Sequence, residues 1–463
     1  MNNKRNTVHA SRSLFILCGT AFLVPFMGSA INLALPEIGQ VFSMKAVTLT
    51  WVATAYLIST AIFQIPCARL ADLVGRKKIF LWGIFIFSLT TFLSGFATNG
   101  TIFITLRFLS GIGSAMVFGT NLAILTSLFP PEKRGKALGI NSAVVYAALA
   151  AGPFLGGFLT HYLGWQSIFF ACAIAGVIIM VATRFLLIGE WMEAKGERFD
   201  ALGSVLYGVS LAGIIYGFST LPGVTGIFCL TGGAVAFVLF IYREKKISFP
   251  VLNLNLFAKN RVFTLSSLAA LINYAATSAI AFMLSLYLQY VRDLDATHAG
   301  LILISQACVQ SLFSLLAGAM SNRFAPSKLA TLGMSIIVLG LAGLIFLTVE
   351  TPYLLIILLL VLLGIGFGIF SSPNTNVIMS SVEKKNYTQA SAITGTMRLT
   401  GQAFSMGIAG MSVSFYIGNQ NLSPSNYPDF MFSMRLTFII FFLLCLLGIY
   451  ASSARIKPMA EPV

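Results

Sequence analysis

The chain has 463 residues, of which 57% are hydrophobic and only 9% are charged. A soluble domain carries about 25% charged residues, so this chain has too few of them to cover a water-exposed surface. Soluble enzymes, secreted modules and nucleic-acid-binding proteins are therefore excluded, and a polytopic membrane protein is predicted. The net charge of +15 is explained by Lys and Arg in cytoplasmic loops and needs no nucleic-acid partner.

Fourteen apolar segments, each about twenty residues long, are predicted to cross the membrane, because a helix of this length spans about 30 Å of hydrocarbon. The first of them is followed by no small-residue cleavage site, so we interpret it as a span and not as a removable signal peptide. The connections are too short to hold a separate soluble domain. In chain order, the predicted spans are 13–36, 47–66, 79–98, 102–127, 137–160, 167–188, 201–220, 226–242, 262–289, 299–319, 329–349, 353–377, 388–416 and 433–453.

Lys and Arg residues are concentrated on one side of these predicted spans. If the N-terminus is cytoplasmic, 23 of the 29 lie in inner segments, and only Lys45 and Arg292 lie in outer loops. This is the positive-inside pattern, and an even number of spans returns the C-terminus to the cytoplasm. We therefore expect a multi-pass protein of the prokaryotic cell membrane with both termini inside.

Residue types that often carry catalysis or bind metals are few and scattered. The six Cys and three His residues form no CxxC pair and no other metal-ligand spacing, and no grouping of His, Asp and Ser is visible. No GxxxxGK[ST] phosphate loop occurs, which excludes an ATP-driven pump. We expect that the protein is not an enzyme and that it has neither a metal site nor a cofactor.

Three short motifs recur along the chain at nearly the same offset. The offsets are 250, 253 and 251 residues. Three echoes in the same order imply that the chain consists of two duplicated halves. The paired segments are 68–78 with 318–328, 111–113 with 364–366, and 132–133 with 383–384.

This repeat predicts a transporter built from two six-helix bundles around a central site. The N-terminal bundle is predicted over residues 1–190 and the C-terminal bundle over 261–463. Two inserted transmembrane helices are predicted between them, over 191–260, outside the symmetry of the bundles.

The loop between the second and third predicted spans, residues 68–78, contains Asp72, Gly75 and Arg76. It resembles the GxxxDxxGRK signature of the major facilitator superfamily, with Ala68 in place of the first Gly. Gly75 lets the turn bend, while Asp72 and Arg76 can pair across the helix ends and hold one conformation. The alternative is a loop that only sets the topology.

Two further segments resemble motifs of the same superfamily. Arg107 lies among apolar residues of the fourth predicted span and is similar to a membrane arginine that the family ties to coupling or substrate binding. The fifth span contains Gly152, Pro153, Gly156 and Gly157, which match the GPxxGG core of the antiporter motif. These residues allow close approach and a kink, so we interpret them as a hinge face; a purely structural packing seam is the alternative.

Together these matches resemble the fourteen-helix drug:proton antiporter branch, and they extend over nearly the whole chain. The resemblance implies an all-α membrane protein with two six-helix bundles plus two inserted helices. One position departs from the branch, because Met27 stands where its first helix usually carries an Asp. A proton-coupled exporter of cations needs a carboxylate that can hold either a proton or the drug. Glu37, at the outer end of the first span, is the best remaining candidate.

Polar residues inside the predicted spans are candidates for contact with substrate or coupling ion. Most are neutral, and together with two arginines they predict a neutral-to-positive cavity suited to a neutral or anionic solute. The alternative for each amide is a hydrogen bond between helices. Besides Glu37, the candidates are Asn32, Gln64, Arg107, Asn121, Tyr146, Gln306, Asn374 and Arg398.

The resemblance implies a secondary active transporter that exports small amphipathic molecules, as in multidrug or antibiotic efflux, by alternating access. Protons are the candidate coupling ion. The alternative is a facilitator or exporter of a neutral or anionic metabolite without proton coupling. The expected partners are a small-molecule substrate and the lipid bilayer, and we expect a monomer.

Overall fold

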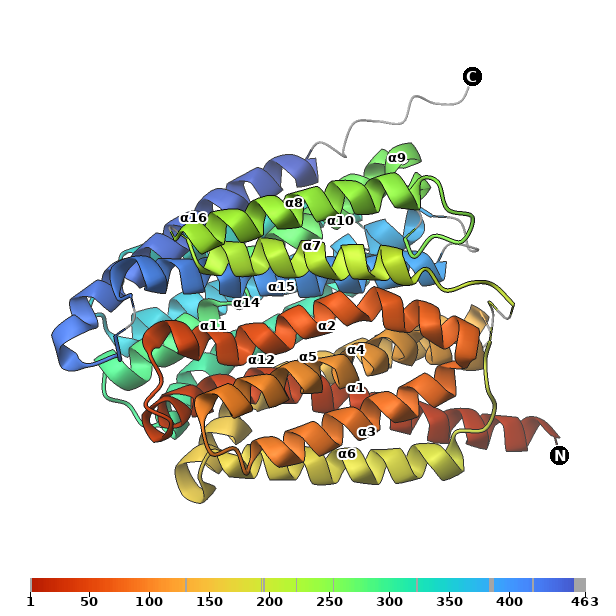
Figure 1. Ribbon diagram of the computed structural model, residues 1–463, viewed down its shortest axis with the longest axis horizontal. Helices are drawn as coiled ribbons and strands as arrows, with labels where there is room; N and C mark the ends of the chain where they lie inside the picture. Colours follow the sequence, from red (N-terminus) through yellow and green to blue (C-terminus); the bar gives the residue numbers. More distant parts are fainter. Residues whose placement is uncertain are drawn as a thin grey trace.

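The structure is a computed structural model that describes residues 2–129, 131–192, 194, 196–221, 223–252, 254–321, 324–382, 387–418 and 420–453. Within these residues all regular elements are helical and no strand occurs (Figure 1). This confirms the predicted all-α fold. In chain order the helices are α1 (Asn2–Val41), α2 (Ala46–Val74), α3 (Arg76–Ser94), α4 (Gly100–Leu128), α5 (Pro131–Leu163), α6 (Gln166–Leu186), α7 (Ala201–Ser219), α8 (Val224–Glu244), α9 (Asn255–Lys259), α10 (Arg261–Ala275), α11 (Ile280–Leu286), the π-helix η1 (Tyr287–Val291), α12 (Ala296–Met320), α13 (Pro326–Ile345), α14 (Tyr353–Ser380), α15 (Tyr387–Tyr416), the 3₁₀-helix η3 (Pro424–Asn426) and α16 (Tyr427–Ser453).

Thirteen segments in the described part of the chain are long and apolar enough to cross a membrane. They account for every predicted span except 388–416, which corresponds to α15. This helix is more polar than the others, yet it has 30 residues, about 45 Å at 1.5 Å per residue. Since α15 also packs against α2, α7, α10 and α16, it completes the set of fourteen.

The ninth predicted span, 262–289, is not one continuous helix. α10 ends at Ala275 and α11 begins at Ile280. Side chains replace helical hydrogen bonds at the break: Thr277 Oγ1 donates to the Asn273 carbonyl (2.6 Å), and Ser405 Oγ accepts from the Ala279 N–H (2.9 Å). Because such insertion of side chains into the backbone ladder interrupts a helix, the span is divided here.

Helices α1–α6, which we call the N-terminal set, and helices α10–α16, the C-terminal set, show the same internal contacts. In the first, α4 packs against α2 and α3, α3 against α6, and α1 against α5. In the second, α14 packs against α12 and α13, α13 against α16, and α10 against α15. The two sets meet where α5 packs against α12 and α2 against α15, and the repeat relates these two contacts to each other. The domain boundaries at 190 and 260 stay predictions.

Glycines permit equivalent helix crossings in the two sets. A Cβ atom on Gly113 would lie 2.7 Å from the Gly83 carbonyl oxygen, and one on Gly366 would lie 2.8 Å from that of Gly333. α3 and α4 therefore cross with backbones nearly in contact, and so do α13 and α14. Among the other echoed residues, Asn322, Arg323, Glu383 and Lys384 lie outside the described residues.

The inserted helices α7 and α8 lie side by side on one face of the bundle (Figure 1). α7 packs against α2 and α15 and so covers one of the two places where the sets meet. Asp200 is the N-cap of α7, and its buried carboxylate accepts hydrogen bonds from Arg243 of α8 (Nη2 to Oδ1, 2.6 Å) and from the Gly203 N–H (3.0 Å). Burial raises the pKa of Asp200, but these hydrogen bonds outweigh it and hold the pKa below its ordinary value.

Candidate functional site

An internal cavity of about 240 Å³ lies between the N-terminal and C-terminal sets. Residues of α1, α2, α4 and α5 line it from one side, and residues of α10, α11, α12, α14 and α15 from the other. Within the described residues, neither α7 nor α8 contributes to its wall. Both sets therefore share the site, which is the arrangement expected of a substrate site between the repeats of a transporter.

Arg107 of α4 places a buried cation on the cavity wall. The residue is 1% exposed, and its guanidinium carbon lies 4.4 Å from the centre of the Tyr56 ring. Nε donates a long hydrogen bond to the Val52 carbonyl (3.4 Å), while Nη1 is buried without a hydrogen-bond partner. No Asp or Glu lines the cavity in the described part of the chain, so the charge of Arg107 is not neutralised there.

Arg398 of α15 supplies a second cation, from the C-terminal set. Its guanidinium lies 5.5 Å from the centre of the Phe118 ring of α4. It also borders a smaller cavity of about 110 Å³, which Asn121, Asn141 and Tyr146 line as well. The two cavities share Phe118, Val145, Tyr146 and Arg398, so the smaller one extends the larger. Both arginines thus face internal space.

Several of the predicted candidates do meet around this space, from helices far apart in the sequence. Tyr146 also joins the two sets, because its hydroxyl is hydrogen-bonded to Ser371 of α14. Asn121 also joins two helices, because its side-chain amide donates a hydrogen bond to the Leu17 carbonyl (2.8 Å). The candidates that line the larger cavity are Asn32, Arg107, Tyr146, Gln306 and Arg398, and Asn121 lines the smaller one.

Other candidates lie outside both cavities. Asn374 is buried and donates to the Ser266 carbonyl (3.2 Å), joining α14 to α10. Gln64 is buried at the contact of α2 with α15, where a Cβ atom on Gly395 would lie 2.9 Å from its amide nitrogen. Met27 is fully buried in the apolar core. For Asn374 and Gln64, the alternative of a contact between helices is the one that the geometry favours.

Glu37 also lies away from both cavities. It is partly buried near the end of α1 and is hydrogen-bonded to the backbone of Trp165, the residue before α6. A carboxylate beside a helix N-terminus satisfies a free N–H group and interacts favourably with the helix dipole. This contact favours a structural role for Glu37.

The residues on the cavity wall that the sequence analysis missed include two tyrosines. Tyr56 of α2 and Tyr274 of α10 both line the larger cavity. The repeat contains a signal for the first, because Tyr56 and the candidate Gln306 differ by 250 positions, the offset of the echoed loops. The same offset relates Tyr274 to Val24, an apolar residue that also lines the cavity, so it gives no polar signal for Tyr274.

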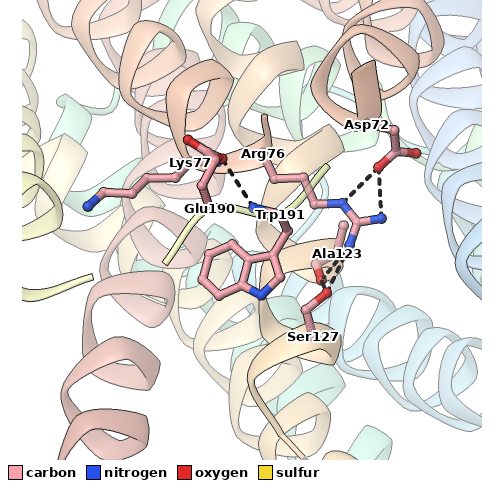
Figure 2. Close-up of polar contacts among 7 residues, drawn as sticks. All are labelled: Asp72, Arg76, Lys77, Ala123, Ser127, Glu190 and Trp191. Atoms are coloured by element: carbon pink, nitrogen blue, oxygen red, sulfur yellow. Dashed lines mark hydrogen bonds and ion pairs between the residues drawn. The ribbon is translucent and has the colours of Figure 1, made fainter. Parts of the chain in front are cut away.

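The loop motif brings Asp72 and Arg76 into direct contact (Figure 2). Arg76 Nε donates to Asp72 Oδ1 (2.7 Å), and Nη1 donates to Ser127 Oγ of α4 (2.8 Å). Arg76 is 2% exposed, whereas the side chain of Asp72 is 28% exposed. One guanidinium therefore joins the ends of α2, α3 and α4, and its charge is compensated by the carboxylate of Asp72 at the end of α2.

The linker between α6 and α7 lies directly against this motif (Figure 2). Glu190 Oε1 accepts from the Lys77 backbone N–H (2.8 Å), and the Trp191 carbonyl accepts from the Arg76 N–H (3.0 Å). Gly75 between the helices has φ +126°, and a Cβ atom there would lie 2.6 Å from the carboxyl carbon of Glu190. Gly75 is thus required both for the turn and for the close approach of Glu190.

Glu190 caps the first turn of α3 from a distant segment, which leads to a stability prediction. Glu190→Ala removes an acceptor for one of the unpaired N–H groups of that turn. We expect the free energy of unfolding to fall by about 1 kcal/mol, as for the loss of a helix cap. A lower melting temperature in detergent would show this effect. The matched control is Glu350→Ala in an exposed loop, and equal melting temperatures of the two variants would contradict the prediction.

The glycines of the fifth predicted span make two kinds of contact. A Cβ atom on Gly152 would lie 2.5 Å from Ser29 Cβ, and one on Gly156 would lie 2.7 Å from Ala30 Cβ, both on α1. By contrast, a Cβ atom on Gly157 would lie 2.4 Å from the Ala296 carbonyl oxygen of α12. The motif therefore packs within the N-terminal set on one side and against the C-terminal set on the other. Pro153 takes part in the second contact, because a Cβ atom on Gly300 would lie 2.4 Å from its carbonyl oxygen.

Several curated relatives that align over most of this chain are named as transporters or resistance proteins. The chain is 29% identical over 402 residues to riboflavin transporter RibZ of Clostridioides difficile, covering 87% of each chain. It is 28% identical to multidrug resistance protein Stp of Mycobacterium tuberculosis (87% of this chain, 76% of the relative). It is 27% identical to the methylenomycin A resistance protein of Bacillus subtilis (90% and 91%).

The fold is also similar to that of a solved transporter structure. A bacterial homologue of the human lysosomal transporter Spinster, crystallised in an inward-facing and unoccupied conformation, superposes with a TM-score of 0.70 at 18% identity. The match covers 98% of this chain and 99% of that one. The sequence model of the Major Facilitator Superfamily matches residues 17–200, 197–406 and 266–460. The chain therefore belongs to the Major Facilitator Superfamily and is a membrane transporter.

Proposed function

We propose that this transporter is a secondary active exporter of small amphipathic molecules that works by alternating access. The cavity shared by the N-terminal and C-terminal sets carries the proposal, because rocking the sets about it would expose it to each side of the membrane in turn. Its wall combines aromatic rings with amides and arginines, which suits amphipathic solutes. Relatives named as multidrug and methylenomycin A resistance proteins support export.

The proposal includes the further expectations from the resemblance, the internal repeat and the distribution of Lys and Arg. These are the drug:proton antiporter branch, the division of the chain at 190 and 260, the cell-membrane location with a cytoplasmic N-terminus, and a monomeric state. The asymmetric distribution of Lys and Arg supports the orientation.

A second candidate is a facilitator or exporter of a neutral or anionic metabolite without proton coupling. The observation that favours it is the lack of any carboxylate on the cavity wall among the described residues, together with buried Met27 in α1. A relative named as a riboflavin transporter supports this candidate.

Transport by purified protein in proteoliposomes distinguishes these functions. Neutral, anionic and cationic dyes are loaded on one side, and their movement is followed with and without an imposed pH gradient. Accumulation against a concentration gradient that depends on the pH gradient would support the exporter. Equilibration that ignores the pH gradient would support the second candidate, and no movement of any dye would contradict both.

We predict that Glu37 is not the proton carrier. Because Glu37 is hydrogen-bonded to the backbone at the start of α6 and lies outside both cavities, Glu37→Gln keeps a hydrogen-bond acceptor at that place. We expect the pH-gradient-dependent rate to stay within about twofold of wild type. A loss of gradient dependence in Glu37→Gln, with expression and dye binding unchanged, would contradict this prediction.

A further inference from the structure

We propose that the cavity binds an aromatic organic anion, whose carboxylate pairs with Arg107. This proposal rests on the proposed function, since it names the class of molecule that the transporter carries. It goes beyond that function because multidrug export alone does not fix the charge of the substrate.

The first argument is the unsatisfied charge of Arg107. A cation at membrane depth is costly unless a partner compensates it. Arg107 is 1% exposed, and its Nη1 has no hydrogen-bond partner. The titratable groups that face it are Tyr56 and Cys172, and both are uncharged at neutral pH. A bound carboxylate would supply the missing acceptor and the missing negative charge together.

The second argument is the sign of the charge along the whole cavity. Arg398 adds a positive charge from α15, and no Asp or Glu lines either cavity in the residues that the structure describes. An organic cation would lose its hydration without gaining a counter-charge and would be repelled by both arginines. The wall therefore discriminates against cations and favours anions.

The third argument is the aromatic part of the wall. Tyr56, Phe118, Tyr146, Tyr274 and Phe367 all line the cavity, and the rings of Tyr274 and Phe367 lie 5.9 Å apart. Aromatic side chains favour offset or edge-on contact with another ring. The volume of about 240 Å³ is below the range of about 300–1,000 Å³ for sites of drug-sized ligands. A compound of one or two rings fits this space.

Three probes with the same ring system test the charge preference. They are 2-naphthoate, 2-naphthamide and 2-naphthylmethylammonium, which carry one negative charge, no charge and one positive charge. Binding to the purified full-length protein in detergent is measured by calorimetry. We expect 2-naphthoate to bind at least about tenfold more tightly than the amide, because a hydrogen bond to a charged group contributes that much, and we expect the cation not to bind.

Variants of Arg107 identify the group responsible. Arg107→Gln should lower the affinity for 2-naphthoate by at least about tenfold and bring it close to that for 2-naphthamide. A melting temperature in detergent close to that of wild type shows that the variant is folded. Arg107→Lys should retain part of the preference. The control is Arg435→Gln, an exposed arginine of α16 outside both cavities, which should bind all three probes as wild type does.

Three results would overturn the proposal: equal affinity for the three probes, preference for the cation, or a preference for 2-naphthoate that survives Arg107→Gln. Displacement of 2-naphthoate by an equal concentration of chloride would identify an inorganic-anion site and overturn the proposal as well.

Transport of the same probes in proteoliposomes separates this proposal from the proposed function. If 2-naphthoate binds at Arg107 but is not moved, the proposed function fails. If only the neutral or cationic probe is moved, the function stands and the anion proposal fails.

Discussion

Replacing Gly157 with Ala is expected to move the transporter about tenfold or more toward the state in which its predicted extracellular end is open. The added methyl group would lie 2.4 Å from the carbonyl oxygen of Ala296, a contact that only separation of α5 from α12 can relieve. Because these helices belong to different sets, the clash opposes closure of that end and leaves the opposite end free.

Labelling of a cysteine in the cavity measures this shift. Asn32, which lines the cavity, is replaced by Cys in a variant whose six native cysteines are replaced by Ser, and an impermeant maleimide is added outside the cells. We expect faster labelling in Gly157→Ala. Gly156→Ala is the matched control, because its methyl group meets Ala30 within the N-terminal set and should lower stability without changing the labelling rate. Equal rates in the two variants would contradict the hinge interpretation.

The long helices could be predicted from the sequence because a membrane span requires a local property, a run of about twenty apolar residues. This property is clear in thirteen segments of the described chain, whereas α15, predicted as the span 388–416, is more polar and falls outside them. The break between α10 and α11 could not be predicted in the same way. It depends on Ser405, which lies 126 residues after Ala279 and accepts its N–H.

The sequence predicts which kinds of residues line the cavity but not which individual residues do so. Polar residues within spans face either internal space or a neighbouring helix, and this rule selected Arg107 and Gln306 together with Asn374 and Gln64. Only the first two line the cavity. The rotation of each helix about its axis decides whether a polar residue faces the cavity or a neighbouring helix. This rotation is set by packing against helices distant in the sequence, so it cannot be predicted from the sequence of one span.

The contact between the loop motif and the linker that contains Glu190 could not be predicted either, because it also joins residues distant in the sequence. The pairing of Asp72 with Arg76 is local, since the two residues are only four positions apart in the sequence, and the motif predicts it. Glu190 accepts a hydrogen bond from the backbone N–H of Lys77, 113 residues earlier in the chain. The linker that contains Glu190 has neither periodicity nor a recognised motif. The structure thus adds a contact between the motif and the segment leading to the inserted helices.

Asp72→Asn is expected to reduce transport by roughly tenfold or more while expression stays close to that of wild type. The amide can still accept one hydrogen bond, but it cannot neutralise Arg76, which is only 2% exposed. A buried cation without its carboxylate is costly, and the guanidinium joins the ends of α2, α3 and α4. These ends, together with the linker held by Glu190, must move as one body when the sets rock, so weakening their connection impairs the cycle more than the fold.

Two measurements separate this effect from unfolding and from a change in topology. Transport is followed in proteoliposomes, and the labelling of Cys at position 32 is followed in cells, in Asp72→Asn and in Asp72→Glu. The second variant restores the charge and should recover part of the transport. Asp429→Asn, an exposed carboxylate near the start of α16, is the control for loss of one negative charge. Normal transport and unchanged labelling in Asp72→Asn would reduce the motif to a topology signal, because the ion pair with Arg76 would then have no part in the conformational change.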